Sequence, residues 1–214
     1  MKLLISISSC QYYEANGLND PMRETWLADA KLLGMDYVFF HGIGSVCKND
    51  VVVLPVEDRL FGLTEKAKAK ARWAVEHGYD FVFSCFPDTY ANAGRLILSG
   101  FEKHDYLGNV FCHPGGTPFC QGGPGYFLSK KACEAISADP TSYLNDDCWV
   151  ADTLIKSGIK PIHHSGFTAF GPGPLVSNYS VTNHLSTQPG GFTGNNMREE
   201  HKRWLCSLEK KLDL

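Results

Sequence analysis

Short apolar runs alternate with polar segments along the first half of the chain. Four runs are rich in valine, isoleucine, leucine and phenylalanine, and they cover residues 2–8, 35–40, 51–56 and 81–86. Apolar runs of this length, bounded by turn-forming residues, are typical of buried β-strands. The first run turns polar at Ser8 without a small-residue cleavage site, which favours a buried strand over a signal peptide.

Between these strands, apolar side chains recur at the three- and four-residue spacing of a helix. One predicted helix covers residues 22–33 and follows Pro21, a residue favoured in the first helical turn. The clearest helix covers residues 63–77, with Thr64 as a candidate cap and Gly78 at its end. The alternation predicts a largely parallel sheet covered by helices, with ligands bound beyond the carboxyl ends of the strands.

The second half of the chain is richer in glycine, proline, asparagine and serine. Two such stretches, residues 115–125 and 166–194, predict long loops over a site. Residues 197–212 predict a final amphipathic helix, with Trp204 and Leu208 on one side. There is no internal repeat and no clear domain boundary, so we expect a single domain.

Composition narrows the class of protein without giving its function. The chain has 214 residues, of which 43% are hydrophobic and 20% charged, and this excludes a disordered chain or a collagen. With 20 basic and 23 acidic residues, no basic excess indicates nucleic-acid binding. All apolar runs are far shorter than the roughly 20 residues of a membrane span. We therefore expect a soluble protein.

Eight cysteines are scattered along the chain without a C-x-x-C pair, which argues against a zinc ribbon or a thioredoxin-like motif. Cys85, Cys120 and Cys148 lie beside apolar or aromatic residues, where a free cysteine behaves as a small hydrophobic residue. We therefore expect reduced thiols in a cytoplasmic protein.

The run at residues 81–86 leads directly into Pro87-Asp88-Thr89. This order places the Asp88 carboxylate at the carboxyl end of a strand, where a hard divalent cation finds oxygen ligands. The alternative is that Asp88 only caps a helix that starts at Thr89.

A second pair of carboxylates, Asp146-Asp147, precedes an apolar helical stretch. Both suit the amino-terminal end of a helix, where the helix dipole favours negative charge. Because only one of them can be the cap, the other is free to face a cleft and act as a general base. A purely structural role for both is the alternative.

Histidines supply the next candidates. His163 and His164 end a strand-like segment, and adjacent residues on a strand point to opposite faces, so at most one of them faces a site. His184 lies in the polar loop region and is a rival. Neutral imidazole is a common metal ligand, although a lone histidine is more often structural.

The glycine-rich segment 121–125 lacks the spacing of a phosphate-binding loop. Gly122, Gly123 and Gly125 before an apolar stretch indicate close approach of the backbone to a ligand. A tight turn explains the same residues equally well.

The order of these segments is more informative than any one of them. The motifs are, by position, R-E-T-W-L at 23–27, D-R-L-F-G-L-T-E-K at 58–66, the tryptophan at 73, the strand and acid at 81–92, Y-L-G at 106–108, C-Q-G-G-P-G-Y-F-L-S at 120–129, N-D-D-C-W-V at 145–150 and H-H-S at 163–165. In this order they resemble the GT-A fold glycosyltransferases of the β-1,3-galactosyltransferase and Fringe type, inverting enzymes that use a nucleotide sugar.

The resemblance implies an α/β protein with the GT-A, or nucleotide-diphospho-sugar transferase, fold: a central, mostly parallel mixed sheet flanked by helices. One catalytic domain would cover residues 1–214, with a nucleotide-binding half at 1–92 and an acceptor half and C-terminal helix at 93–214. It implies a hexosyltransferase that takes its sugar from a UDP-sugar, UDP-glucose or a related hexose, and gives it to a glycan hydroxyl in glycoprotein glycan synthesis. The alternative is a non-catalytic module that binds nucleotide sugar or glycan.

The resemblance also implies roles for individual residues. Asp147 would be the catalytic base, and Asp88 with His164 would hold Mn²⁺ or Mg²⁺, with His163 and His184 as other candidates for the imidazole. The residues implied to bind the nucleotide sugar are Ser6, Arg23, Asp58, Lys66, Asp88, Gly122 and Gly123.

One departure from the family pattern bears on the substrate. Where the family has three acids, this chain has Phe86-Pro87-Asp88. The last acid, the family's principal metal ligand, is kept, while the first, which contacts ribose or sugar, is lost. The sugar preference is therefore in question more than the metal. Large algal viruses carry soluble glycosyltransferases of this sort for capsid glycans, and we expect a virus-encoded relative acting in the host cytoplasm.

Overall fold

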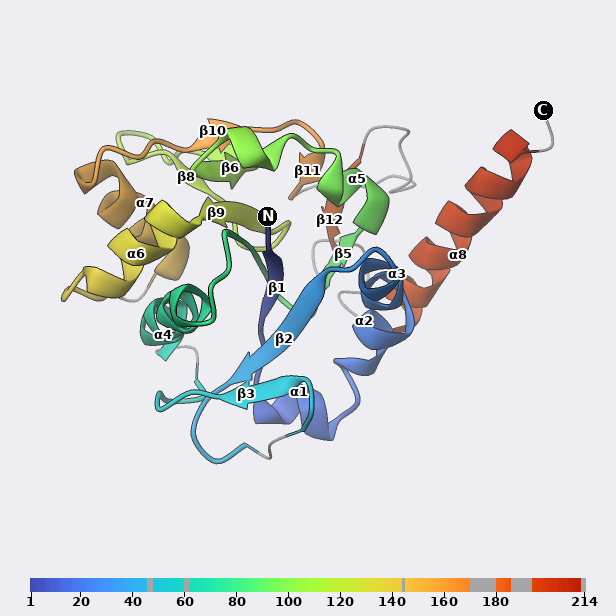
Figure 1. Ribbon diagram of the computed structural model, residues 1–214, viewed down its shortest axis with the longest axis horizontal. Helices are drawn as coiled ribbons and strands as arrows, with labels where there is room; N and C mark the ends of the chain where they lie inside the picture. Colours follow the sequence, from blue (N-terminus) through green and yellow to red (C-terminus); the bar gives the residue numbers. More distant parts are fainter. Residues whose placement is uncertain (46–47, 60–61, 144, 170–179, 186–193, 213–214) are drawn as a thin grey trace.

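A seven-stranded sheet forms the centre of the computed structural model, which describes residues 1–45, 48–59, 62–143, 145–169, 180–185 and 194–212 (Figure 1). The strand order is β10-β6-β9-β4-β1-β2-β3. These strands are β1 Leu3–Ser8, β2 Asp36–His41, β3 Val51–Val53, β4 Phe81–Cys85, β6 Tyr106–Gly108, β9 Tyr126–Ser129 and β10 Ile162–His163. β9 is antiparallel to both of its neighbours, while the other pairs are parallel. The prediction of a mostly parallel mixed sheet is confirmed.

Two smaller sheets and a set of helices complete the described fold. The first small sheet has the order β11-β12-β5 and the second pairs β7 with β8. Their strands are β5 Thr89–Ala91, β7 Val110–Phe111, β8 Phe119–Cys120, β11 Phe167–Thr168 and β12 Thr182–His184. The helices are α1 Gln11–Ala15, α2 Asp20–Glu24, α3 Trp26–Leu32, α4 Leu63–Glu76, α5 Ala93–Ile97, the 3₁₀ helix η2 Phe101–Lys103, α6 Lys130–Ala138, α7 Asp146–Lys156 and α8 Gly194–Leu212.

The side chains of β1 show that the sheet is buried on both faces. Side chains alternate along a strand, so Ile5 and Ile7 enter one core with Trp26 of α3, while Leu4 enters a second core with Trp149 of α7. All five are fully or almost fully buried. In Figure 1, α4, α6 and α7 cover one face, and α2, α3 and α5 lie against the other. Burial on both faces is the reason that the strands are continuous apolar runs.

Four local predictions need correction. The helix predicted over residues 22–33 breaks at Thr25, whose backbone angles of φ −116° and ψ −115° are not helical, and this separates α2 from α3. The helix predicted at 63–77 is capped by Gly62 rather than Thr64. Asp88 does not cap a helix, because residues 89–91 form β5. The third strand ends at residue 53 rather than 56.

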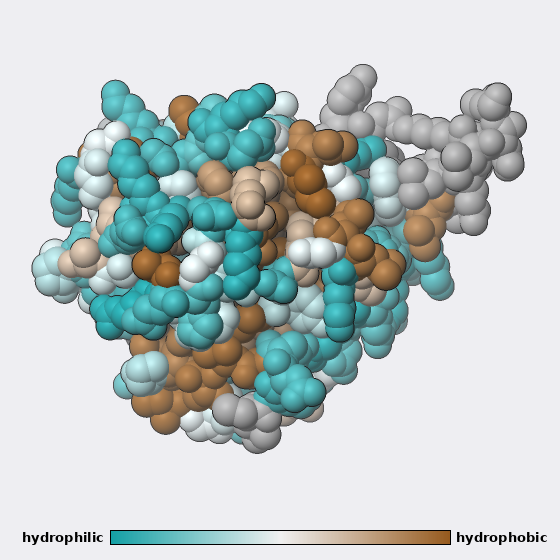
Figure 2. All heavy atoms as spheres, in the orientation of Figure 1, coloured by the Kyte–Doolittle hydropathy of each residue, from teal (hydrophilic) through white to brown (hydrophobic). Residues whose placement is uncertain are grey.

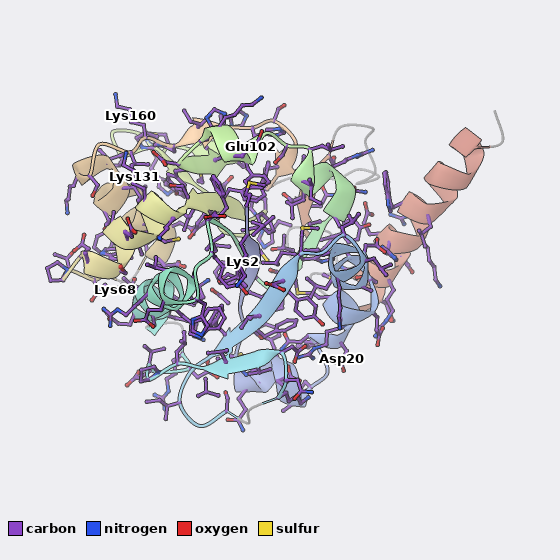
Figure 3. All side chains as sticks on the ribbon, in the orientation of Figure 1. Lys2, Asp20, Lys68, Glu102, Lys131 and Lys160 are labelled. Atoms are coloured by element: carbon purple, nitrogen blue, oxygen red, sulfur yellow. The ribbon has the colours of Figure 1, made fainter. Side chains whose placement is uncertain are left out.

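The last described helix, α8, extends away from the sheet towards the C-terminus (Figure 1). None of the helices in the described part of the chain is long and apolar enough to cross a membrane. On the face drawn in Figure 2, hydrophobic side chains gather over β2 and β3 and, separately, over α3 and α5, where Leu32 and Leu98 are exposed. Charged side chains such as Lys131 and Lys160 lie at the periphery (Figure 3).

Candidate active site at the carboxyl ends of β1 and β4

A tight turn follows β4 and presents Asp88. The Thr89 backbone N–H donates to the Phe86 carbonyl oxygen at 3.0 Å, so Pro87 occupies the second position of the turn, where its fixed φ is favoured. The Thr89 hydroxyl accepts from the Phe86 N–H at 3.2 Å and donates to the Gly123 carbonyl oxygen at 2.7 Å. The turn is therefore held from two sides.

Asp88 lies against a histidine from a distant part of the chain. The Nε2 atom of His184 is 3.0 Å from Oδ2 of Asp88. Strand β12 is antiparallel to β5 and places His184 opposite Thr89, and the Leu185 N–H donates to the Asp88 carbonyl oxygen at 2.8 Å. The carboxylate and the imidazole are 16% and 22% exposed, so both side chains are partly open to a ligand.

The imidazole beside Asp88 is thus that of His184, and the two other histidines lie elsewhere. The His164 Nδ1 atom accepts from the Gly166 N–H at 3.0 Å, and the His164 ring packs on Phe167. The His163 Nδ1 atom accepts from the Val110 N–H at 3.1 Å. His164 was expected first because His163-His164-Ser165 falls where the resembling family has a metal-binding histidine. The pairing of β12 with β5, which brings His184 in, joins segments too far apart to be predicted from periodicity.

The second carboxylate, Asp147, lies in the first turn of α7. Neither Asp146 nor Asp147 is the cap: the Asn145 side chain accepts from the Cys148 N–H at 3.2 Å. The Gly122 N–H donates to Oδ2 of Asp147 at 2.8 Å, while Oδ1 is buried and has no hydrogen-bond partner among the described residues. Burial, and then the neighbouring Asp146, raise the pKa of Asp147 to about 7. One oxygen of this carboxylate is therefore fixed by the loop, and the other is buried without a hydrogen-bond partner.

Gly122 and Gly123 bring these groups together. A Cβ atom on Gly122 would lie 2.6 Å from Oδ1 of Asp147 and 2.8 Å from the Phe86 ring, and one on Gly123 would lie 2.3 Å from Nδ1 of His184. Side chains at either position are excluded by these contacts. The segment also makes a turn, since the Gly125 N–H donates to the Gly122 carbonyl oxygen at 2.8 Å. The tight-turn interpretation of the glycines is confirmed. The close approach that the structure shows is to the side chains of Asp147 and His184, and approach to a ligand stays a prediction.

A cavity of about 240 Å³ opens beside the Asp88 turn, beyond the carboxyl ends of β1 and β4. The residues that line it are Ser8, Ser9, Cys10, Tyr13, Asp58, Arg59, Leu63, Lys66 and Phe86. Burial, and then the charge of Asp88, raise the pKa of Tyr13, which places Asp88 close to this wall. The cavity therefore lies beside the Asp88 turn, with Phe86 in its wall, at the strand ends where an α/β sheet binds its ligands.

Asp58 and Lys66 form a buried ion pair in the cavity wall. Their Oδ1 and Nζ atoms are 2.7 Å apart, and Nζ also donates to the Ser9 carbonyl oxygen at 2.7 Å. Asp58 further accepts from the backbone N–H groups of Gln11 and Gly42 at 2.7 and 2.8 Å. The pair connects the loops after β1 and β2, and so shapes the cavity.

Of the seven residues expected at the nucleotide sugar, Asp58 and Lys66 line the cavity. Asp88, Gly122 and Gly123 lie in the neighbouring turn and glycine segment, and Ser6 and Arg23 are held elsewhere. Ser6 is fully buried within β1 on the α4 side of the sheet. The Arg23 guanidinium binds Asp50 at 2.7 Å and Glu14 at 2.9 Å and stacks on Phe39. Its charge is therefore already paired with carboxylates. Ser8, two residues after Ser6, lines the cavity instead.

Lys70 is a buried residue that sequence reasoning missed. Its ammonium group donates to the hydroxyls of Ser8 and Ser84, which lie at the ends of β1 and β4. Burial lowers the pKa of Lys70 to about 8. The four-residue spacing from Lys66 to Lys70 puts both on one face of α4, and this spacing was the available signal.

A metal ion would find two protein donors in this site. In the part of the chain that the structure describes, no group of three or more histidine, cysteine, aspartate or glutamate side chains could hold a metal ion. The pair Asp88 and His184 offers one carboxylate and one imidazole at 3.0 Å, and this donor set suits Mn²⁺ when the substrate supplies the other ligands.

Comparison with known proteins supports the fold. A crystal structure of a glycosyltransferase involved in the glycosylation of the major capsid of PBCV-1 matches with a TM-score of 0.61 and 13% identity, over 95% of this chain and 100% of that one. Two further structures are a candidate glucose-1-phosphate thymidylyltransferase from Bacillus anthracis in complex with sucrose (TM-score 0.49, 11% identity, 77% of this chain and 87% of that one) and A197 from STIV (0.44, 11%, 77% and 82%). Because the TM-scores of these two structures are below 0.5, the assignment of the fold depends on the PBCV-1 structure.

No protein-family model and no curated protein matches the sequence. The likeness to the PBCV-1 glycosyltransferase, which extends over nearly the whole chain, is therefore one of structure. The chain has a GT-A-like glycosyltransferase fold.

Proposed function

We propose that the chain is an inverting, metal-dependent glycosyltransferase that moves a hexose from a UDP-sugar to a hydroxyl group of a glycan. The proposal depends on one observation. A carboxylate–imidazole pair and a separate buried carboxylate lie against the adjacent residues Gly122 and Gly123, beside a cavity. The pair is Asp88 and His184, and the separate carboxylate is Asp147. The GT-A-like fold supports the same assignment.

The cavity suits the nucleoside part of the donor. Its wall combines the polar groups of Ser8 and Ser9 with the aromatic rings of Tyr13 and Phe86. A concave site with apolar walls and a few polar groups is typical of a small-ligand site. Lys66 is already paired with Asp58, whereas Arg59, which also lines the wall, brings a positive charge to the cavity.

In this proposal Asp88 and His184 would hold Mn²⁺ or Mg²⁺. Their carboxylate oxygen and imidazole nitrogen lie 3.0 Å apart. A cation held there would stabilise the negative charge that develops on the leaving diphosphate.

Asp147 acts as the general base. The Gly122 N–H fixes Oδ2, and Oδ1 is left to accept the proton of the acceptor hydroxyl. Burial and the neighbouring Asp146 raise the pKa of this carboxyl group, which makes its ionised form a stronger base than an ordinary aspartate. The hydroxyl then attacks the anomeric carbon from the face opposite the diphosphate, which inverts the configuration.

The strongest alternative is a non-catalytic module that binds a nucleotide sugar or a glycan. The presence of Phe86 and Pro87 in place of two family acids favours it. The buried Asp147 carboxylate favours the enzyme, because a binding module does not need a base.

The acceptor in this proposal is a glycan on a protein, and the reaction takes place in the cytoplasm. The capsid glycosylation named for the PBCV-1 glycosyltransferase supports the acceptor. The six cysteines whose side chains the structure describes are all free, and they support the compartment. They are Cys10, Cys85, Cys112, Cys120, Cys133 and Cys148.

The test is release of UDP from UDP-sugars in the presence of Mn²⁺, with and without a glycan acceptor. We expect release by the wild type and its loss in Asp147→Asn. Asp152→Asn is the matched control, because Asp152 lies on the same helix and binds the Tyr143 hydroxyl away from the glycines. Binding of UDP-sugar without release under any condition would favour the non-catalytic module.

A further inference from the structure

A buried lysine is linked to the cavity through one serine. Lys70 lies on α4, and its ammonium group donates to the Ser8 hydroxyl at the end of β1 and, at 3.1 Å, to the Ser84 hydroxyl in β4. Lys70 is buried and does not line the cavity, whereas Ser8 lines it and is half-buried. Ser8 is therefore the point where this group of side chains meets a ligand in the cavity.

The ammonium group has no carboxylate partner. In the part of the chain that the structure describes, Lys70 forms no ion pair, while its neighbours on the same helix, Lys66 and Lys68, pair with Asp58 and Glu65. Burying an ammonium group without an ion pair costs stability. Burial lowers the pKa of Lys70 to about 8, so the group is still mainly charged at neutral pH. Packing alone does not account for a lysine at this position.

The hydrogen bond from Lys70 fixes what the Ser8 hydroxyl can do. An ammonium group only donates, so the Ser8 oxygen accepts from it and the Ser8 hydrogen is left to donate to another atom. The Ser84 side chain also hydrogen-bonds the Tyr126 hydroxyl. The Ser8 hydroxyl, in contrast, has no acceptor among the residues that the structure describes. Its hydrogen is therefore available to a ligand in the cavity.

The charge of Lys70 makes this hydroxyl a strong and directed donor. A hydroxyl whose oxygen accepts from a cation is polarised, and the hydrogen bond that it donates becomes stronger. The bond also limits rotation of the Ser8 hydroxyl, because a hydrogen turned towards Lys70 would break it. A ligand group that offers lone pairs gains from this arrangement, while an amino group would place hydrogen against hydrogen.

We infer that the Ser8 hydroxyl, held by Lys70, donates to an oxygen of the bound nucleotide, either a uracil carbonyl or a phosphate oxygen. Ser8 is then a binding residue, and Lys70 is a positioning residue that acts through it. The inference rests on the proposed function and adds to it two residues that recognise the nucleotide of the donor.

The experiment is a double-mutant cycle on the dissociation constant of UDP in Mn²⁺. The proteins are wild type, Ser8→Ala, Lys70→Met and the variant with both substitutions, with Ser8→Thr as the variant that keeps the hydroxyl. Lys68→Met is the matched control, because Lys68 lies on the same helix, is buried to a similar degree and does not line the cavity. Binding is measured rather than transfer, because Lys70 also interacts electrostatically with Asp146 beside the proposed base.

We expect Ser8→Ala to weaken UDP binding about 5- to 20-fold, the effect of one lost hydrogen bond, and Ser8→Thr to stay within about threefold of wild type. Lys70→Met weakens UDP binding about three- to tenfold in the wild-type background, but less than about twofold in the Ser8→Ala background. Lys68→Met leaves UDP binding unchanged. A lysine that only supported the fold would weaken UDP binding equally in both backgrounds.

The same proteins titrated with uridine identify the oxygen. A loss in Ser8→Ala that is equal for uridine and UDP assigns the uracil carbonyl, and a loss for UDP alone assigns a phosphate oxygen. Should Lys70→Met not fold, the comparison of Ser8→Ala with Ser8→Thr still decides the role of the hydroxyl.

Unchanged UDP binding in Ser8→Ala, or equal effects of Lys70→Met in the two backgrounds, would overturn the inference and leave the proposed function in place. If the wild type binds no UDP, the proposed function fails and the inference fails with it.

Discussion

His184 Nε2 lies 3.0 Å from Asp88 Oδ2, although 96 residues separate the two in the chain. The contact depends on the antiparallel pairing of β12 with β5, in which His184 stands opposite Thr89. It converts a lone carboxylate at the end of β4 into a carboxylate–imidazole pair. In the proposed function, binding of a divalent cation would therefore depend on both strands.

Substitution of either member of this pair removes the metal-dependent part of nucleotide binding. We expect Asp88→Ala to abolish the enhancement of UDP binding by Mn²⁺ and His184→Ala to weaken it at least tenfold. His164→Ala is the control and leaves it unchanged, because the His164 ring binds Gly166 instead. Isothermal titration calorimetry with UDP, with Mn²⁺ or with EDTA, measures the effect. UDP binding by the wild type that is equal in Mn²⁺ and in EDTA would contradict the assignment.

Gly123 permits the approach of His184, so even a methyl group there disturbs the pair. A Cβ at this position lies 2.3 Å from Nδ1 of His184, well inside van der Waals contact. We expect Gly123→Ala to reduce Mn²⁺-dependent UDP binding about as strongly as His184→Ala. Gly94→Ala is the matched control: its Cβ meets the nearest atom, from Asn92, at 3.6 Å, and alanine is favoured in helix α5. Unchanged binding in Gly123→Ala would show that the imidazole is not needed.

Asp147→Asn separates binding from catalysis. The asparagine oxygen still accepts from the Gly122 N–H, so the loop is kept, but the amide cannot take a proton. We expect UDP affinity within about threefold of wild type and a loss of transfer rate of roughly 10²- to 10⁴-fold, the usual contribution of a general base. Single-turnover transfer to a glycan acceptor measures the rate. Transfer at the wild-type rate would exclude Asp147 as the base.

The same substitution has a pH-dependent effect on stability. The pKa of Asp147 rises from 3.8 to about 7 on folding, so the folded state holds a proton that the unfolded state has lost between these two values. Stability therefore falls as pH rises through this window, by at most about 1.4 kcal/mol per pH unit, and then levels off. We expect Asp147→Asn to be more stable than wild type at pH 8, with a gap that narrows towards pH 4.

Thermal unfolding of the two proteins in EDTA at pH 4, 5, 6, 7 and 8 measures this gap. Asp152→Asn, on the exposed side of α7, serves as the reference for loss of a carboxylate. A difference in melting temperature between Asp147→Asn and wild type that stays constant across the range would exclude the raised pKa.

Much of the fold could be predicted because its signals are local. The sheet strands at 2–8 and 81–86 and the helix at 63–77 follow from short apolar runs and helical spacing, and the structure places them within one or two residues of the expected ends. The break at Thr25 was not predictable, because Trp26 and Leu27 continue the apolar spacing across it.

The site could be predicted in part for the same reason. Asp88 and Gly122 belong to segments whose order along the chain is informative, and both lie where the strands end. His184 and Phe86 acquire their positions from contacts across distant segments, so only the structure shows that they lie beside Gly123 and Asp147. Ser6 is fully buried within β1 and does not line the cavity. Composition does not predict the burial of an individual residue.

The most direct test of the central claim is one assay: release of UDP from UDP-sugars by the wild-type chain and by Asp147→Asn, each in Mn²⁺ and in EDTA. We expect the wild type to release UDP in Mn²⁺ and its rate of release to fall at least a hundredfold in EDTA. We expect a similar fall in Asp147→Asn, with UDP binding retained. Release that is equal in Mn²⁺ and EDTA, or equal in the two proteins, would contradict it.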